Sequence, residues 1–218
     1  MNSEVLLSID CSNRWSCFGL AVDGRAAGEK NLDLGRAQAG ALPLVAEELL
    51  AQASLKIQDV TCLAVAIGPG YFTGIRIGMA YAAGLAFALS AGVVPFSTLE
   101  GVLRSCPGWD RGLKVPLAAA SRERVFSSAW RDGQPVLAEM ERGREEVLAQ
   151  AGALSPDFEL WAVNDARLFA NSSREGVHFI DCPSGGAEAL LGWERRNLRV
   201  KPDELRAQYM REPGLGYP

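Results

Sequence analysis

A glycine-rich segment between two apolar stretches constrains this chain more than any other feature. Residues 68–78 read Gly-Pro-Gly-Tyr-Phe-Thr-Gly-Ile-Arg-Ile-Gly, and residues 63–67 before them form a short apolar run typical of a buried strand. Gly-Pro-Gly predicts a turn, and Thr73 is the expected N-cap of a helix over residues 73–91. The segment therefore predicts a strand, a tight turn and a long helix in direct succession.

The expected helix carries a row of small side chains. Residues four apart lie on one face of a helix, and this row consists of Gly74, Gly78, Ala82, Ala86 and Ser90. A face with no side chain larger than a hydroxymethyl group lets another backbone approach closely. We interpret the row as a surface against which another element packs.

Composition limits the classes of protein and partner. With 218 residues, 48% of them apolar, the chain can bury a real core as one large domain or two small lobes. A formal net charge of −4 provides no basic field for holding a polyanion, which disfavours tight tRNA binding by this chain alone. The five cysteines are odd in number and lack C-x-x-C spacing, which favours reduced thiols over disulfides or a zinc site.

Neither a targeting segment nor a membrane span is expected from the sequence. The first residues lack the basic region and long apolar core of a signal peptide, so we expect a cytoplasmic location. Residues 77–99 contain no charge and are long enough to span a bilayer. They are rich in Ala and Gly, however, and Gly92 should end the helix before a strand begins at residue 93, so we expect no membrane contact.

Hydrophobic periodicity predicts an α/β protein with two lobes. In the first lobe we expect strands at residues 5–9, 16–22, 26–32, 61–67 and 93–96, with helices at 38–53 and 73–91. A cluster of turn-forming residues at 106–112 separates this lobe, residues 1–106, from a second lobe, residues 107–218. Strands expected at 115–120, 124–131, 136–141 and 159–163, with a helix at 144–151, make the second lobe an abridged copy of the first.

The glycine-rich segment resembles a motif of the bacterial TsaB proteins, also called YeaZ. Residues 7–12 and 95–99 are similar to further family motifs, so the resemblance covers residues 5 to about 100. In the second half only residues 124–126 and 209–211 are similar to family patterns. The resemblance implies the two-lobed fold of actin, Hsp70 and the sugar kinases (the ASKHA fold).

The same resemblance implies a role and a set of partners. TsaB proteins are partner subunits in the synthesis of threonylcarbamoyladenosine in tRNA, so we expect a non-catalytic scaffold that activates a catalytic relative, TsaD. The pair would engage an ATPase, TsaE, and would act on tRNAs that read ANN codons, with tRNA contacted through the complex. On this interpretation the row from Gly74 to Ser90, with the helix at 38–53, is the partner-binding surface, and homodimers form when the partner is absent. No intrinsic cofactor is expected; ATP or ADP and Mg²⁺ would be bound only in the assembled complex.

Candidate catalytic residues are few. The resemblance implies that working enzymes of this superfamily place one carboxylate at the end of the first strand of each lobe to organise Mg²⁺ and phosphates. Asp10 fits the first position, but residues 115–121 offer no carboxylate for the second. We therefore interpret Asp10 as a strand-end residue that accepts hydrogen bonds from the following turn.

Other chemistries remain as alternatives. The N-terminus of the helix near Thr73, together with Arg76, could contact a phosphate or nucleotide, although the lysine of a phosphate-binding loop is missing. An active small-molecule kinase or ATPase of the same superfamily is the main alternative function, and the missing second carboxylate argues against it. The single histidine, His178, excludes a multi-histidine metal site and is expected to be a strand residue, which argues against a metallopeptidase.

Overall fold

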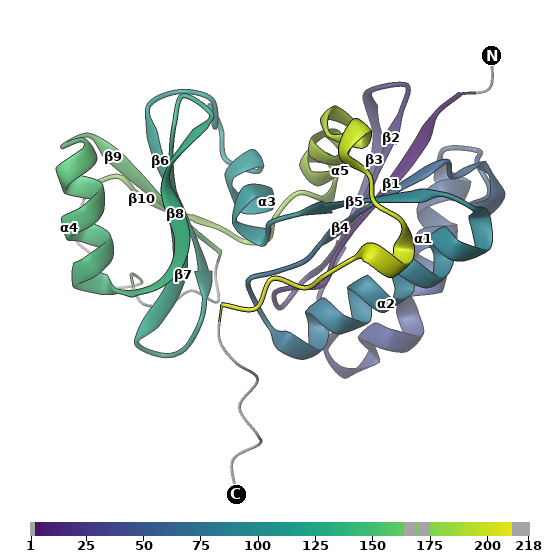
Figure 1. The fold of residues 1–218 in the computed structure, drawn as a ribbon, viewed down its shortest axis with the longest axis horizontal. Coiled ribbons are helices and arrows are strands. Elements are labelled where there is room, and N and C mark those ends of the chain that lie inside the picture. The colour runs from purple at the N-terminus through teal and green to yellow at the C-terminus, as the bar shows by residue number, and fades with distance from the viewer. Residues whose placement is uncertain (1–2, 164–168, 170–174, 211–218) are drawn as a thin grey trace, which may run out of the picture.

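The described residues form two five-stranded sheets, one in each lobe (Figure 1). The computed structural model describes residues 3–163, 169 and 175–210. The first sheet has the order β3-β2-β1-β4-β5, and its strands are β1 (Val5–Asp10), β2 (Ser16–Val22), β3 (Arg25–Leu32), β4 (Cys62–Ala66) and β5 (Gly92–Phe96). The first three strands form an antiparallel meander, and β4 and β5 extend the sheet in parallel.

The second sheet repeats this topology. Its order is β10-β9-β6-β7-β8, with β6 (Leu113–Ala119), β7 (Arg124–Arg131), β8 (Gln134–Gly143), β9 (Phe158–Val163) and β10 (Val177–Ile180). Here too an antiparallel meander is followed by parallel strands. The predicted two-lobed fold of actin, Hsp70 and the sugar kinases is confirmed, and His178 lies in β10 as predicted.

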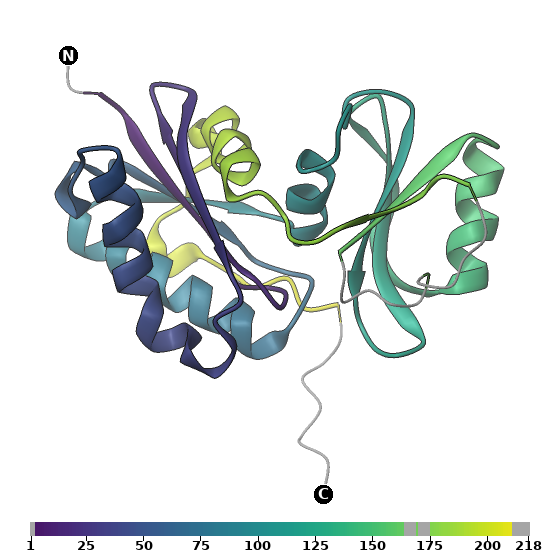
Figure 2. The ribbon, with the colours of Figure 1, turned by 180° about the vertical axis from the view of Figure 1, so that it is seen from behind.

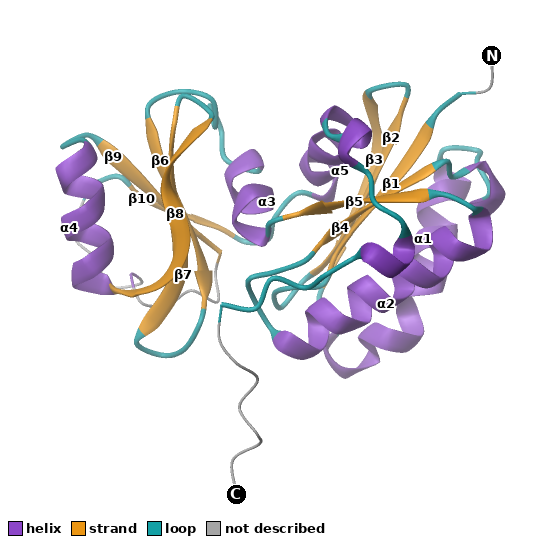
Figure 3. Cartoon of the chain, viewed as in Figure 1, coloured by secondary structure: helices purple, strands orange, loops and turns teal. Residues whose placement is uncertain are grey.

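In the described part of the chain, five α-helices cover the sheets (Figure 3). They are α1 (Gln38–Gln52), α2 (Phe72–Leu89), α3 (Thr98–Arg104), α4 (Arg144–Leu154) and α5 (Gly185–Glu194), and short 3₁₀ turns lie at Gly35–Ala37, Ile57–Asp59, Arg196–Leu198 and Pro202–Glu204. Within the described ranges the second lobe has α4 on its outer side, where the first lobe has both α1 and α2 (Figure 2). The predicted abridgement of the second lobe stays a prediction, because most of the segment between β9 and β10 lies outside the described residues.

Alternating side chains of β1 place a core on each side of the first sheet, as the pleat of a strand requires. Leu7 and Ile9 pack in the cluster that α1 and α2 cover, whereas Leu6 packs in the cluster that α5 covers. Ser8, on the same side as Leu6, donates through its hydroxyl to the carbonyl of Gly185 at 3.0 Å. Both faces of the sheet are therefore buried at β1.

Each of the two helices between the lobes follows a strand of one lobe but packs on the sheet of the other. Helix α3 follows β5 of the first lobe but packs on β6 of the second, and α5 follows β10 of the second lobe but packs on β1, β2 and β3 of the first. In Figure 1 both helices lie between the two sheets. The chain after α5 also returns to the first lobe, where Val200 bridges Val93. The predicted assignment of residues 107–218 to the second lobe is therefore wrong for α5 and the segment after it.

Helix α5 approaches β2 so closely that side chains are excluded at the contact. A Cβ atom added to Gly19 would lie 1.7 Å from the carbonyl oxygen of Gly185. Gly19→Ala should displace the start of α5 and lower the free energy of unfolding by about 2 kcal/mol. Gly84→Ala is the matched control, because nothing lies within 4 Å of a Cβ atom there, and it should raise stability by about 0.5–1 kcal/mol. Urea denaturation of both variants would check this, and equal effects would contradict it.

Candidate functional site

The glycine-rich loop is anchored to the end of β1. The amide of Tyr71 donates to the carbonyl of Ser12 at 2.6 Å, and a Cβ atom on Gly70 would lie 2.1 Å from that same oxygen. Helix α2 begins at Phe72 with Tyr71 as its N-cap, and no side chain caps it. The prediction that Thr73 is the N-cap is therefore wrong, because the backbone contact with Ser12 starts the helix earlier.

The row of small residues on α2 faces the chain's own core. Gly74 and Gly78 are buried beside Cys11, and a Cβ atom on Gly74 would lie 1.9 Å from the Cys11 carbonyl oxygen. Ala82 and Ala86 have no exposed surface and belong to the first-lobe core. The small side chains thus let α2 approach this chain's own sheet and strand end, and the prediction that these four residues bind a partner is wrong.

Ser90, the last residue of the predicted row, is exposed at the helix end. Its φ of 54° places it in the left-handed region as the C-cap of α2, a conformation that commonly ends helices. It takes no part in the buried packing of the row. Its predicted partner contact stays a prediction.

The opposite side of α2, together with the outer side of α1, exposes an apolar surface. We define the α1–α2 outer face by its exposed apolar residues Gly40, Pro43, Leu44, Ala80, Gly84 and Phe87; the exposed acid Glu47 lies on the same side of α1. Phe87 is 81% exposed and Leu44 is 62% exposed. By length and composition α2 is also the one helix in the described part of the chain that could cross a membrane. Helices α1 and α2 contact each other on the same side of the sheet, so the face spans both (Figures 1 and 2).

Asp10 is buried at the end of β1 and pairs with a second carboxyl group. Its carboxylate accepts from the amide of Ser12 at 2.6 Å and from the side chain of Asn13 at 3.3 Å, as expected for a strand-end residue. Its remaining partner is Glu188 in the first turn of α5. Both side chains have no exposed surface, so Asp10 cannot touch a bound nucleotide in this conformation. Its predicted nucleotide contact is therefore wrong.

The pairing of Asp10 and Glu188 requires a proton. No donor within the described residues reaches either carboxylate oxygen of Glu188, and two carboxyl groups can share a hydrogen bond only when one of them is protonated. Burial raises the pKa of Glu188 well above its ordinary value, and the charge of Asp10 adds to this shift. Burial also raises the pKa of Asp10, against the hydrogen bonds from Ser12. We assign the shared proton to Glu188.

Sequence reasoning missed Glu188. Its neighbours in the sequence give no sign of a partner, and the pairing depends on the return of α5 to the first lobe. At the corresponding end of the second lobe, Ala118 packs with Leu99 and Phe126 in an apolar cluster. The second carboxylate near Asp10 thus comes from the crossing helix and not from β6.

Thr73 and Arg76 lie at the surface near the start of α2. The Arg76 guanidinium covers the ring of Phe72 at 3.6 Å and donates from Nε to the hydroxyl of Tyr209 at 3.1 Å. Thr73 lines a cavity of about 480 Å³ between the starts of α1 and α2. An anion contact at these two residues stays a prediction. In the described ranges no group of three His, Cys, Asp or Glu side chains could hold a metal ion.

Comparison with known proteins matches both the sequence and the fold. The family model described as "TsaD: tRNA N6-adenosine threonylcarbamoyltransferase" matches residues 34–130. The tRNA threonylcarbamoyladenosine biosynthesis protein TsaB of Haemophilus influenzae is 32% identical over 105 residues, which cover 48% of this chain and 44% of that protein. TsaB proteins from two other bacteria also match. The sequence is therefore similar to the TsaB (YeaZ) proteins.

Two further proteins are similar to this chain in fold or in sequence. The structure of YeaZ from Pseudomonas aeruginosa superposes with a TM-score of 0.75 at 21% identity, over 94% of this chain and 99% of that one, which shows a shared fold. A tRNA N6-adenosine threonylcarbamoyltransferase of Thermus thermophilus is 37% identical over 79 residues, covering 36% of this chain and 24% of that protein. The alignments with these two curated relatives span less than half of their length.

Proposed function

We propose that this chain is a member of the TsaB family and a non-catalytic scaffold and activator subunit in the synthesis of threonylcarbamoyladenosine in tRNA. It pairs with a TsaD-like catalytic subunit, and the pair engages a TsaE-like ATPase and modifies tRNAs that read ANN codons. The relatives named TsaB support the pathway. The observation that carries the scaffold role is the exposed α1–α2 outer face with Phe87 at its surface.

An exposed apolar face of this kind fits a protein partner. Large side chains such as Phe87 contribute most to binding when a partner buries them, and exposed apolar patches commonly mark interaction surfaces. Ala80 and Gly84 lie on the same outward side of α2 and leave room for another helix to approach closely. The family model of TsaD matches residues 34–130, which include α1 and α2. A TsaD-like partner would therefore present a related pair of helices.

The proposed lack of catalysis is supported by the surroundings of Asp10. Its carboxylate is buried and accepts hydrogen bonds from Ser12 and Asn13, and burial raises the pKa of the neighbouring Glu188 well above its ordinary value. A carboxylate in this state cannot organise Mg²⁺ and phosphates without rearrangement of α5. Nucleotide and Mg²⁺ would then be bound by the assembled complex. Two copies of this chain would pair through the α1–α2 outer face when the partner is absent.

Phe87→Arg should abolish partner binding without unfolding the chain. It would place a long cation in the proposed interface, and we expect the affinity for the TsaD subunit of the same organism to fall about a hundredfold or more. Because Phe87 is exposed, the melting temperature should stay within a few degrees of the original. Titration calorimetry and a thermal melt measure the two effects. Cells that lack the native gene should regain the modified nucleoside with the original chain and not with the variant.

Phe179→Arg is the matched control for this experiment. Phe179 is also an exposed aromatic residue, 42% exposed, but it lies on β10 of the second lobe. This variant should bind TsaD normally and restore the modification. If Phe87→Arg bound TsaD as tightly as the control, the α1–α2 outer face would not be the interface and the scaffold proposal would lose its physical basis.

A further inference from the structure

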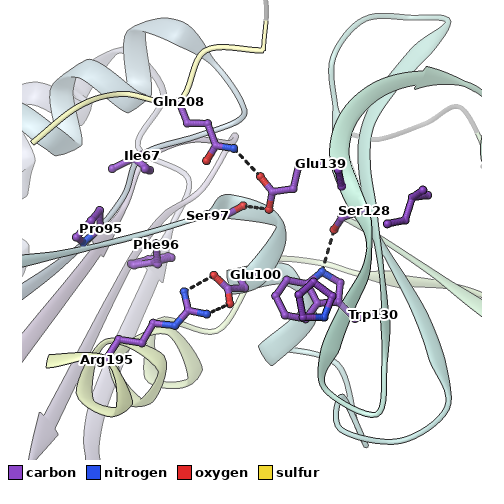
Figure 4. Close-up of a pocket in the computed structure, with 13 residues that line it drawn as sticks. Ile67, Pro95, Phe96, Ser97, Glu100, Ser128, Trp130, Glu139, Arg195 and Gln208 are labelled. Atoms are coloured by element: carbon purple, nitrogen blue, oxygen red, sulfur yellow. Dashed lines mark hydrogen bonds and ion pairs between the residues drawn. The ribbon is translucent and has the colours of Figure 1, made fainter. Parts of the chain in front are cut away.

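A pocket between the two lobes has chemistry that the proposed function does not use. It has a volume of about 360 Å³, and its lining comes from β5 and α3 on one side and from β7 and β8 on the other, with Arg195 and Gln208 at its edge. Figure 4 shows Glu139 pointing from the second lobe toward Ser97 and Gln208. Pockets of this size at the junction of two lobes are common positions for small ligands.

Glu139 gives the pocket an uncompensated negative charge. Its carboxylate accepts hydrogen bonds from the Ser97 hydroxyl and, at 2.9 Å, from the side-chain amide of Gln208, and both donors are neutral. Among the ion pairs of the described residues none includes Glu139. The other acid in the pocket, Glu100, is paired through both oxygens with the Arg195 guanidinium. One carboxylate therefore remains without a cation.

This carboxylate is in an environment that favours a positive partner. Burial raises the pKa of Glu139, and the hydrogen bonds from Ser97 and Gln208 oppose this shift only in part; the nearby Glu100 charge raises it further. Glu139 is partly buried, and a partly buried carboxylate is stabilised most by a cation at hydrogen-bond distance. The side-chain amide of Gln208 occupies the place beside the Glu139 carboxylate where a cation would interact most favourably. The backbone amide of Gln208 donates to the carbonyl of Ile67 at 2.7 Å.

The walls of the pocket suit an apolar body next to that cation. Phe96, Pro95 and Ile67 line the first-lobe side, and Trp130 and Leu137 line the second-lobe side. The Trp130 indole donates to the Ser128 hydroxyl at 3.0 Å, which fixes the orientation of the ring. Aromatic faces attract ammonium and guanidinium groups as well as apolar groups. Anionic ligands such as nucleotides are disfavoured by the charge of Glu139.

We propose that this pocket is a binding site for a small organic cation, with a primary ammonium or guanidinium group on a short apolar or aromatic body. The cation donates to the Glu139 carboxylate in place of the Gln208 amide, and the body lies against Trp130. The site is separate from the α1–α2 outer face and does not depend on the proposed function. Because both lobes contribute to it, a bound cation would also link them.

The probes for the first test are 2-phenylethylammonium and agmatine, with 2-phenylethanol as the neutral analogue. The readout is the shift of the Trp130 indole N–H resonance in the full chain, assigned with Trp130→Phe. We expect saturable binding of the cations at millimolar concentration or below, and binding of the alcohol at least tenfold weaker. No saturable shift with either cation, or equal binding of the alcohol, would overturn the proposal.

Two substitutions at the carboxylate should act in opposite directions. Glu139→Gln removes the charge with little change in shape and should weaken cation binding at least tenfold, whereas Gln208→Ala removes the competing donor and should strengthen it a fewfold. Glu123→Gln is the control, because Glu123 is an exposed acid of the same lobe outside the pocket lining. Unchanged affinity in Glu139→Gln, or weaker or unchanged affinity in Gln208→Ala, would overturn the proposal.

A third variant tests the pocket without altering the carboxylate. Ala138 is exposed at the rim of the pocket, next to Glu139 in β8. Ala138→Trp should fill the pocket and abolish cation binding while the melting temperature stays near that of the original chain. If Glu139→Gln fails to fold, this variant decides alone: a folded Ala138→Trp that binds the cations normally would place their site elsewhere.

Discussion

Ala82→Arg is expected to unfold the first lobe. Ala82 has no exposed surface and lies among the core residues that α2 places on the sheet. A guanidinium there would be too large for the site and would be buried without an acidic partner, which costs on the order of 3–5 kcal/mol or more. That is a large part of the total stability of a typical domain, about 5–15 kcal/mol. Circular dichroism with a thermal melt should show loss of cooperative unfolding.

Ala80→Arg separates this effect from a general intolerance of α2 to charge. Ala80 lies two residues earlier in the same helix, but on its exposed side. This variant should keep the melting temperature of the original chain within a few degrees and should lose TsaD binding, since Ala80 belongs to the α1–α2 outer face. A folded Ala82→Arg chain with a normal melt would mean that the row of small residues is not a core surface.

The row of small residues on α2, predicted to bind a partner but buried in the core, shows which part of the structure can be predicted from the sequence. The strands, the long helix and the repeated order of elements follow from periodicity and turn residues, and the structure confirms them. The side of α2 that faces the core does not follow, because both sides of this helix are small or apolar and residues 77–99 contain no charge. Periodicity locates a buried face only when the opposite face is polar.

Contacts between segments that lie far apart in the chain also cannot be predicted from this sequence. Burial of Glu188 depends on α5 returning to the first lobe, and the charge of the interlobe pocket depends on Glu139 meeting the segment around Gln208. Neither residue lies in a recognisable motif. Asp10 was identified as a strand-end residue because its hydrogen bond to the Ser12 amide is local. Hydrogen bonds between residues close in the sequence can therefore be predicted, whereas contacts between residues of different segments cannot.

Glu188→Gln should make the chain more stable relative to the original as pH rises. Burial and the charge of Asp10 raise the pKa of Glu188 in the folded state, and Glu29 and Cys182 act in the same direction. A carboxyl group of this kind contributes stability that is fully present below its unfolded pKa and is lost as pH rises through the folded pKa. The folded original chain therefore holds a proton that the unfolded chain releases above about pH 4.5.

A glutamine at position 188 has no such proton but can still donate a hydrogen bond to Asp10. The difference in free energy of unfolding, variant minus original, should rise by about 1.4 kcal/mol per pH unit above the unfolded pKa. The rise should continue until the pH reaches the raised folded pKa of Glu188. Urea denaturation at a series of pH values measures this slope.

Gly84→Ala is the control for the pH series, because it changes stability without a titrating group and its difference from the original should be independent of pH. The slope for Glu188→Gln decides the result, since a constant offset from altered packing would not mimic it. A flat difference curve would mean that Glu188 is ionised in the folded chain. Asp10 would then face a second buried negative charge with no donor among the described residues to compensate it, and the assignment of the shared proton would have to be abandoned.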